Sequence, residues 1–352
     1  MNNDLEQRSV NSSAPASPGS GALSLSVPYF LSCDWGTSSL RLRVVRSADL
    51  TVDSEVRAND GIAVTYQAWK TAQPSPVSRF SYFLAVLRRH LDELERQSGR
   101  SLAGLPLVMS GMASSSIGCR EVPYAMMPIA ANGSDLRVET IEQNRDFPHD
   151  VLLISGARSE NDVMRGEETQ LTGALLRKPD TRERQLFIFP GTHSKHVVVE
   201  NGYAVGLTTF MTGEFFELLS RKSVLAASVQ ASDAAGTAED RAEFRAGVCE
   251  GAAKNLLHAC FDVRVRSLLN AKSPSANYHY LSGLLIGSEL GTLRSAGIPV
   301  TLVGNGELAI KYFAALRILN VEVAPDLIDV DDALIRGQWV VWCNFCRASV
   351  NR

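Results

Sequence analysis

The sequence has little of what several common classes of protein require. Its six cysteines among 352 residues are too sparse for a disulfide framework, which makes a reducing compartment the default. The formal net charge is −3, so bulk charge gives no support to nucleic-acid binding. No run approaches the ~18 uninterrupted apolar residues that a membrane-spanning helix needs. We therefore expect a cytoplasmic protein with neither a nucleic-acid nor a membrane partner.

Sequence signatures of several well-known catalytic folds are also absent. The chain has neither the P-loop pattern GxxxxGK[ST] nor GxGxxG, which disfavours P-loop and Rossmann nucleotide binding. Cys343 and Cys346 form a lone CxxC without a second pair, which disfavours zinc and redox sites. The composition, with 45% apolar and 21% charged residues, is that of an ordinary globular protein, and the length predicts about two domains.

Residues 1–26 differ in composition from the rest of the chain. Ser, Asn, Pro, Ala and Gly dominate this segment, as in SVNSSAPASPGSGALS. Such a segment cannot bury enough apolar surface to offset the entropy lost on ordering. We therefore expect a disordered tail and leave it out of the fold prediction.

Hydrophobic periodicity divides residues 27–352 into two halves with one order of elements: three short strands, then alternating helices and strands. In the first half we expect strands at 27–34, 40–45, 52–56, 105–109 and 151–155, an irregular stretch before the last of them, and a helix over 80–94 that Gly99 ends. In the second half we expect strands at 186–189, 196–199, 205–210, 300–303 and 321–324, a helix capped by Thr212, and helices over 240–261, 278–295, 307–319 and 331–345. The pattern predicts two α/β lobes of matching strand order.

Each half begins with an apolar strand that ends in a Gly-Thr turn, Asp34-Trp-Gly-Thr37 in one and Pro190-Gly-Thr192 in the other. Backbone N–H groups exposed at such turns bind anions, and glycine allows a phosphate to approach closely. Two such turns facing each other would hold one polyphosphate from both sides. A carboxylate beside phosphates, here Asp34, needs a cation such as Mg²⁺ between them. Each turn taken alone is better explained as an ordinary hairpin with a polar tip. The occurrence of both turns at the same place in matching halves favours phosphate binding.

Two further segments fit a site for phosphoryl transfer. Val300–Gly306 runs from a strand into a glycine-rich turn and then a helix, a place where a helix N-terminus can hold a nucleotide, although an ordinary βα turn looks the same. Glu167 and Glu168 follow Arg165-Gly166 and begin a helix just before the second turn. Acidic residues suit the first turn of any helix, but a carboxylate in this place could also accept the proton of a hydroxyl that attacks a phosphate.

Taken together, these residues closely resemble a known family. From about residue 28 to about residue 345 the chain is similar to the 2-keto-3-deoxygalactonokinases, which belong to the sugar kinase, actin and Hsp70 superfamily. The blocks that carry the resemblance are DWGTSSLRL (34–42), SGMASSSIGCREVPY (110–124), VMRGEETQLTGA (163–174), PGTHSKHV (190–197), FMTGEFFELL (210–219) and LSGLLIGSEL (281–290). The resemblance implies a two-lobed actin-like ATPase (ribonuclease H-like) α/β fold, each lobe a mixed sheet with flanking helices and the active site in the cleft between the lobes.

The resemblance also implies an activity. This is the ATP- and Mg²⁺-dependent phosphorylation of the terminal (C6) hydroxyl of 2-dehydro-3-deoxy-D-galactonate, giving a 6-phosphate for an aldolase in galactonate catabolism. On this comparison Asp34 is the metal ligand and a catalytic residue. The first phosphate motif maps onto Asp34, Gly36, Thr37, Ser38 and Arg41. The second maps onto Gly191, Thr192, His193, Ser194 and Lys195. The adenosine motif maps onto residues 304–306, where Gly304 and Gly306 are the expected nucleotide contacts.

The catalytic base is assigned by position in the same comparison. Related carbohydrate kinases place a Gly-Asp step at the start of a helix just ahead of the second phosphate motif. Gly166-Glu167 occupies that slot here, so Glu167 is the expected base, with Glu168 and Asp162 as alternatives. The adenosine motif is a further departure, because the residues Asn305-Gly306-Glu307 of this chain differ from the turn that many relatives have at this position.

Side chains for a sugar acid are expected between the two phosphate motifs. Arginine matches a carboxylate with paired hydrogen bonds, so Arg120 and Arg165 are candidates for the substrate carboxylate. Ser115 and Tyr124 are candidates for its hydroxyls. For Arg120 the alternative is a simple ion pair with Glu121 or another surface acid.

The predicted domains are the tail, an N-terminal lobe over 27–165, a C-terminal lobe over 166–330, and a final helical segment, 331–352, that packs back on the N-terminal lobe.

Other functions fit the same fold. These are a catalytically silent sugar-acid sensor, a kinase for the gluconate epimer, and a phosphohydrolase. The oligomeric state stays open, a homodimer included.

Overall fold

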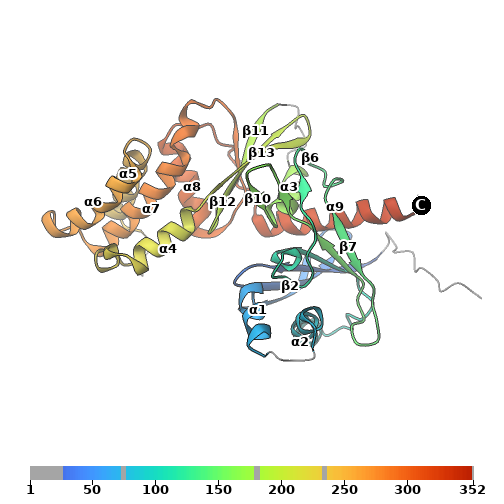
Figure 1. The fold of residues 1–352 in the computed structure, drawn as a ribbon. Coiled ribbons are helices and arrows are strands. Elements are labelled where there is room, and N and C mark those ends of the chain that lie inside the picture. Colours follow the sequence, from blue (N-terminus) through green and yellow to red (C-terminus); the bar gives the residue numbers. More distant parts are fainter. Residues whose placement is uncertain (1–26, 73–76, 178–182, 232–235, 351–352) are drawn as a thin grey trace, which may run out of the picture.

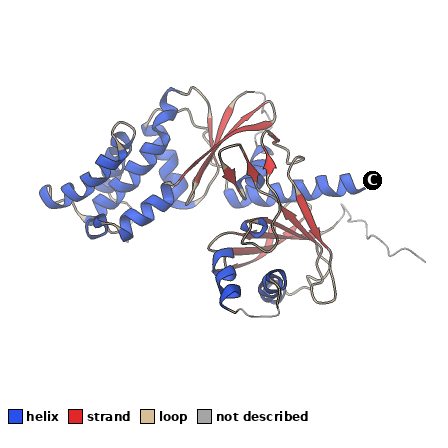
Figure 2. Cartoon of the chain, in the orientation of Figure 1, coloured by secondary structure: helices blue, strands red, loops and turns tan. Residues whose placement is uncertain are grey.

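The computed structural model describes residues 27–72, 77–177, 183–231 and 236–350 of the chain (Figure 1). The predicted tail, 1–26, lies outside the described residues. The α/β architecture in two lobes is as predicted. One lobe carries a sheet with two helices on its outer face, and the other carries a second sheet whose far side is covered by a group of helices (Figure 2).

The first lobe is built on a six-stranded sheet in the order β3-β2-β1-β4-β8-β7. The first three strands form an antiparallel meander, as predicted, while β4 and β8 run parallel to β1. Every residue of β4 and β8 is buried, which explains their continuous apolar sequences. The strands are β1 (Tyr29–Trp35), β2 (Leu40–Arg46), β3 (Val52–Ala58), β4 (Leu107–Gly111), β7 (Val138–Ile141) and β8 (Val151–Ile154).

Two helices, α1 (Ile62–Thr71) and α2 (Arg79–Ser98), cover the outer face of this sheet. α2 packs Phe83, Leu87 and Leu91 onto the sheet, at the spacing that the sequence predicts. It ends at Gly99, whose φ of 65° is the left-handed conformation that glycine adopts easily at a helix C-terminus. α1 was not predicted.

Short elements lie on both sides of β8, and those before it occupy the stretch that the sequence predicts to be irregular. A turn of 3-10 helix, η1 (Met112–Ser114), follows β4. Three two-residue strands, β5 (Ala125–Met126), β9 (Ala157–Arg158) and β10 (Val163–Met164), form a small sheet. β6 (Ile129–Ala130) pairs with β13 and so joins the sheet of the second lobe, although it precedes residue 165.

The second lobe has a five-stranded sheet in the order β14-β11-β12-β13-β6. Here too the first three strands form an antiparallel meander, and β14 runs parallel to β11. The predicted strand at 321–324 is wrong: the chain touches the three-residue edge strand only through isolated bridges, Val300 to Val323 and Val303 to Ile328. The strands are β11 (Gln185–Phe189), β12 (Ser194–Glu200), β13 (Tyr203–Phe210) and β14 (Val300–Leu302).

The helices on the far side of the second sheet differ from prediction in two places. The expected helix over 240–261 is two helices, because Asn255 caps a new one by accepting hydrogen bonds from the backbone N–H groups of Leu257 and His258. Thr212 is not a cap; Met211 occupies that position, and the Thr212 hydroxyl is used elsewhere. The elements are α4 (Thr212–Lys222), η2 (Val224–Ser228), α5 (Ala238–Gly251), α6 (Leu256–Leu269), α7 (Pro274–Leu290), η3 (Gly291–Ser295) and α8 (Gly306–Ile318).

The remaining helices, α3 (Glu167–Leu175) and α9 (Val330–Val350), lie between the two sheets and pack on both. They cross in backbone contact, since a Cβ on Gly173 would lie 1.8 Å from the carbonyl oxygen of Ala333. Trp339 of α9 stacks on Phe30 of β1, with ring centroids 5.1 Å apart. The two lobes are therefore joined by a shared layer of two tightly crossed helices.

Candidate active site

Two carboxylates predicted from the sequence meet where β1 ends and α3 begins. Two glycines with positive φ, Gly111 at 83° and Gly166 at 111°, lie against each other there, and a Cβ on Gly166 would be 3.6 Å from the Cα of Gly111. A Cβ on Gly111 would lie 3.3 Å from Oδ1 of Asp34. Bare glycine backbone thus places Asp34 and Glu167 within electrostatic reach of each other.

The environment of this pair disfavours negative charge on it. Burial raises the pKa of Glu167 above its usual range, and the negative charge of Asp34 raises it further, whereas Lys195 lowers it. The Nζ atom of Lys195 lies 3.8 Å from Oε1 of Glu167. Burial likewise raises the pKa of Asp34, an effect that Arg41 and Arg43 oppose. Shifted carboxyl groups of this kind concentrate at catalytic sites.

The two alternative bases are both held by other contacts. Glu168 is buried at 1% exposure, and its two oxygens accept hydrogen bonds from the backbone N–H of Gly166 at 2.9 and 2.8 Å. Burial, and then the charge of Glu167, raise its pKa to about 7. Asp162 accepts hydrogen bonds from the backbone N–H and hydroxyl of Thr209, at 2.6 and 2.7 Å. Glu167, whose side chain is 22% exposed, is the carboxylate that faces Lys195.

The first Gly-Thr turn is fixed from behind by the start of α1. The carbonyls of Gly36 and Thr37 accept hydrogen bonds from the backbone N–H groups of Ile62 and Ala63, at 2.9 and 3.1 Å. The side chains of Thr37 and Ser38 are exposed. Nearby, Nη1 of Arg41 lies 3.6 Å from Oδ2 of Asp34. The turn therefore offers hydroxyls, a guanidinium and a carboxylate along one edge.

The second turn is braced by α4 in the same manner. Gly213 touches it so closely that a Cβ there would lie 2.5 Å from the carbonyl oxygen of Gly191. The Thr192 carbonyl accepts a hydrogen bond from the backbone N–H of Glu214 at 3.0 Å, and the Glu214 carboxylate pairs with His193 at 2.6 Å. Thr192 and His193 are exposed, whereas Lys195 is buried next to Glu167.

Ser194 has a different place from its neighbours in the turn. It is fully buried, and its hydroxyl donates to Oε1 of Glu289 at 2.8 Å. The same carboxylate accepts hydrogen bonds from His196 at 2.8 Å, from Tyr312 at 2.5 Å, and from Thr212. Ser194 thus supports the turn from beneath, and Glu289 ties together β12, α4 and α8.

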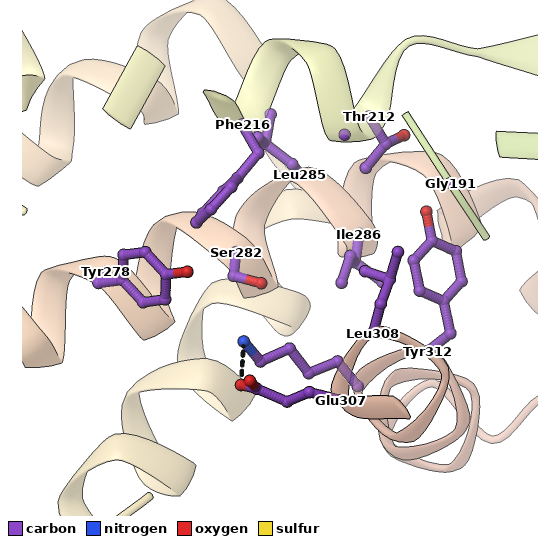
Figure 3. A pocket seen from close by; sticks show the side chains of 12 residues that line it. Gly191, Thr212, Phe216, Tyr278, Ser282, Leu285, Ile286, Glu307, Leu308 and Tyr312 are labelled. Atoms are coloured by element: carbon purple, nitrogen blue, oxygen red, sulfur yellow. Dashed lines mark ion pairs between the residues drawn. The ribbon is translucent and has the colours of Figure 1, made fainter. Parts of the chain in front are cut away.

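A pocket of about 270 Å³ opens beside the second and third turns. The third turn adjoins the second, since a Cβ on Gly304 would lie 3.6 Å from Cδ of Pro190, and α8 begins at Gly306 with a φ of 64°. Nζ of Lys311 and Oε1 of Glu307 form an ion pair of 2.7 Å at the pocket wall (Figure 3). The pocket is lined by Gly191, Thr212, Gly213, Phe216, Tyr278, Ser282, Leu285, Ile286, Glu307, Leu308, Lys311 and Tyr312.

Arg165 is held next to Glu167 by the segment after β4. Its Nη1 donates to the carbonyl and the hydroxyl of Ser114, at 2.7 and 2.5 Å. Its guanidinium lies over the ring of Tyr124, 4.2 Å from the centroid. Two of the expected substrate residues, Arg165 and Tyr124, are thereby brought together beside the expected base.

A sequence model of the 2-keto-3-deoxy-galactonokinase family matches residues 34–341. The chain belongs to this family. A relative from Rhizobium meliloti (strain 1021), assigned as a 2-dehydro-3-deoxygalactonokinase, is 34% identical over 319 residues, which are 88% of this chain and 95% of the relative. The 2-dehydro-3-deoxygalactonokinase of Escherichia coli (strain K12) is 30% identical over 226 residues, 62% of this chain and 72% of that protein.

A crystal structure from Sinorhizobium meliloti supports the same family. It belongs to a protein assigned as a 2-dehydro-3-deoxygalactonokinase, which is 31% identical and superposes with a TM-score of 0.72 over 88% of this chain and 97% of that one. The resemblance to the family seen in the sequence is confirmed. The described residues also form the expected two α/β lobes, each a mixed sheet with flanking helices. No helix in the described part of the chain has the length and apolar character needed to cross a membrane.

The remaining expected substrate residues of this 2-keto-3-deoxy-galactonokinase family member are engaged in local contacts. Arg120 donates to Glu139 of β7 at 2.6 Å and lies over the ring of Phe80, so it forms the simple ion pair that the sequence left open. The hydroxyl of Ser115 donates to the carbonyl of Met112 at 2.7 Å. Both positions remain predictions for substrate contact.

Glu289, which sequence reasoning missed, is expected to be a determinant of stability. Replacing Glu289 with Gln keeps the shape of the side chain but turns one hydrogen-bond acceptor into a donor. The new donor would then face the hydroxyl donors that now bond to the carboxylate. We expect the free energy of unfolding to fall by about 2 kcal/mol, measured by urea denaturation. Glu217→Gln on the exposed face of α4 is the matched control and should change stability by less than about 0.5 kcal/mol. Equal stability of the two variants would contradict the bracing role of Glu289.

Proposed function

We propose that the chain is an ATP-dependent kinase that phosphorylates the terminal (C6) hydroxyl of 2-dehydro-3-deoxy-D-galactonate. The observation that carries this proposal is the meeting of Asp34, Glu167 and Lys195 between the two Gly-Thr turns, in a member of this family. A carboxylate base, a second carboxylate and a cation at one point suit the transfer of a phosphoryl group to a hydroxyl.

The two turns and the pocket are the proposed site of ATP. Backbone N–H groups and hydroxyls of the first turn, with Arg41, would contact the phosphates from one lobe. Gly191, Thr192 and His193 would contact them from the other lobe, and Lys195 would balance the charge that develops on the transferred group. The pocket beside Gly304 and Gly306, with apolar walls from Leu285, Ile286 and Leu308, would receive the nucleoside.

Asp34 fits the ligand set of Mg²⁺. Because Gly111 has no Cβ, the space next to Oδ1 of Asp34 is left open. Mg²⁺ is usually held by one or two carboxylates together with water and substrate phosphates, and Asp34 would supply such a carboxylate. When bound there, Mg²⁺ would neutralise charge on the phosphates.

Glu167 is the proposed general base. It would accept the proton of the C6 hydroxyl as that oxygen attacks the phosphoryl group. The charge of Lys195 lowers the pKa of this carboxyl and so opposes the effect of burial. Arg165, fixed by Ser114 and stacked on Tyr124, is the proposed partner of the substrate carboxylate. Arg120 and Ser115 would need to exchange their present partners to reach the substrate.

Replacing Asp34 with Asn should weaken the dependence of turnover on Mg²⁺. An amide is a poorer ligand than a carboxylate, so we expect the Mg²⁺ concentration that gives half-maximal activity to rise about 10-fold. Asp53→Asn is a suitable control. Asp53 lies on the edge strand β3, where its carboxylate pairs with Arg46 and Arg100. An unchanged magnesium titration of the Asp34 variant would refute the role of Asp34.

The substrate is tested by ADP release in a coupled assay over a panel of 2-keto-3-deoxy acids and simple sugars. We expect turnover with the galactonate-type acid to exceed that with the gluconate epimer, which differs at one hydroxyl. Thermal stabilisation by such an acid without turnover would indicate a sensor instead. Release of phosphate without any acceptor would indicate a phosphohydrolase.

A further inference from the structure

One carboxylate outside the family motifs bonds to Arg41 of the proposed first phosphate motif and to Asn305 of the third turn. Asp331 lies in the first turn of α9, and its Oδ1 accepts hydrogen bonds from Nη1 of Arg41 at 3.0 Å and from Nη2 of Arg43 at 2.8 Å. Its Oδ2 accepts from Nδ2 of Asn305 at 3.3 Å. Arg41 follows the first turn, in the first lobe, and Asn305 lies in the third turn, in the second lobe.

The contact with Arg43 fixes Asp331 in place. The Arg43 side chain is 2% exposed, and its Nε is held by Glu55 at 2.6 Å. A guanidinium fixed in this way is a rigid anchor for the carboxylate that it meets. Asp331 therefore has a defined position from which to orient other groups.

Arg41 is the group whose orientation depends on Asp331. Its Nη1 lies between two carboxylates, 3.0 Å from Asp331 and 3.6 Å from Asp34. Without the Asp331 carboxylate, Arg41 would be drawn onto Asp34 and would compete with Mg²⁺ for it. With it, the remaining donors of the guanidinium stay available, because arginine has five N–H groups. Its side chain is 32% exposed and so accessible to a ligand.

We propose that Asp331 is a positioning residue of the nucleotide site: it holds Arg41 toward the phosphates and Asn305 in the third turn, and so couples the two lobes when ATP binds. The proposal rests on the proposed kinase function. The competing explanation is that Asp331 only neutralises the buried Arg43, which would affect stability but not the nucleotide.

The decisive comparison is between Asp331→Asn and Asp332→Asn. Asp332 is the next residue of the same helix turn, and its carboxylate also bonds to two arginines, Arg177 at 2.9 Å and Arg336 at 2.8 Å. Both variants lose a carboxylate paired with arginine, but of these two carboxylates only Asp331 bonds to Arg41 and Asn305. We expect Asp331→Asn to weaken MgATP binding about 10-fold or more by calorimetry and to lower kcat, and Asp332→Asn to bind MgATP within 2-fold of the wild type.

A double-mutant cycle tests the coupling itself. Arg41→Lys and Asn305→Ala both act on partners of Asp331, so their effects on MgATP affinity should be non-additive in the wild-type background and additive in the Asp331→Asn background. The Asn305→Ala variant leaves the ion pair between Asp331 and Arg43 intact. The measurement in the wild-type background therefore remains informative even if Asp331→Asn folds poorly. Additive effects in the wild type, or unchanged MgATP affinity of Asp331→Asn, would overturn the proposal.

The calorimetric readout separates this proposal from the kinase function. MgATP binding needs no sugar acid, so an incorrect acceptor would leave the test of Asp331 intact. Absence of MgATP binding to the wild-type protein would instead overturn the proposed function itself. Normal binding to both wild type and Asp331→Asn would overturn only the role of Asp331.

Discussion

Replacing Glu167 with Gln is expected to lower kcat at least ~100-fold while the KM for ATP changes little. The amide keeps the size of the side chain and cannot accept the proton of the attacking hydroxyl, and general bases contribute about 10²–10⁴-fold to rate. The measurement is steady-state kinetics with 2-dehydro-3-deoxy-D-galactonate and ATP. A near-normal kcat would remove Glu167 from the role of base.

Two matched variants distinguish Glu167 from its alternatives. Asp162→Asn disturbs the contacts with Thr209, and Glu168→Gln disturbs the start of α3, so both should affect stability more than kcat. A loss of kcat in either variant comparable to that of Glu167→Gln would transfer the assignment.

The pH dependence of the wild type supplies an independent check on Glu167. Burial raises the pKa of this carboxyl above its usual 4.5, and only the ionised form can accept a proton. We therefore expect kcat to fall as the pH drops through an apparent pKa above 4.5.

Replacing Gly173 with Ala is expected to destabilise the protein by about 3 kcal/mol or more. Alanine normally favours a helix over glycine by about 1 kcal/mol, but here its Cβ would lie 1.8 Å from the carbonyl oxygen of Ala333 and 2.6 Å from the backbone nitrogen of Gly337. Overpacking of a core costs about 1–3 kcal/mol, occasionally more, and this clash is with backbone that cannot change rotamer. Urea denaturation measures the effect.

Gly236→Ala is the control for this substitution. The atom nearest to a Cβ at that position is Cβ of Asp240 at 3.8 Å, an ordinary contact. We expect its stability to stay within about 1 kcal/mol of the wild type. If Gly173→Ala were as stable as this control, the close crossing of α3 and α9 would be incorrect.

Most of the regular structure could be predicted because it follows hydrophobic periodicity. The strands of both meanders and the helix that Gly99 ends appear at or near the predicted positions. α1 was missed because it buries only Ile62 and Thr65, too few residues to produce a pattern. The single helix expected over 240–261 was wrong because the first helix ends at Gly251 and Asn255 caps a second one that begins at Leu256.

The candidate site was predictable where its residues lie in local motifs, and not where they act over long distances in the chain. Asp34 and Glu167 stand at the ends of recognisable elements. Glu289 and Asp331 have no such motif, since Asp331 bonds to Arg41 across 290 residues and Glu289 bonds to Ser194 across 95. Their partners are determined by tertiary packing, which a single sequence does not display.

The position of α9 has a consequence for the order in which this protein can fold. Gln338 of this helix donates hydrogen bonds to the carbonyl of Cys33 and the hydroxyl of Ser110, and Trp342 is buried in the same core as Phe30. The inner face of the first sheet is therefore covered by a helix whose Gln338 the ribosome adds 305 positions after Cys33 and 228 positions after Ser110. Domains that are made first often fold first. Here the first lobe must keep apolar surface uncovered until α9 arrives, so the two lobes should reach the native state together.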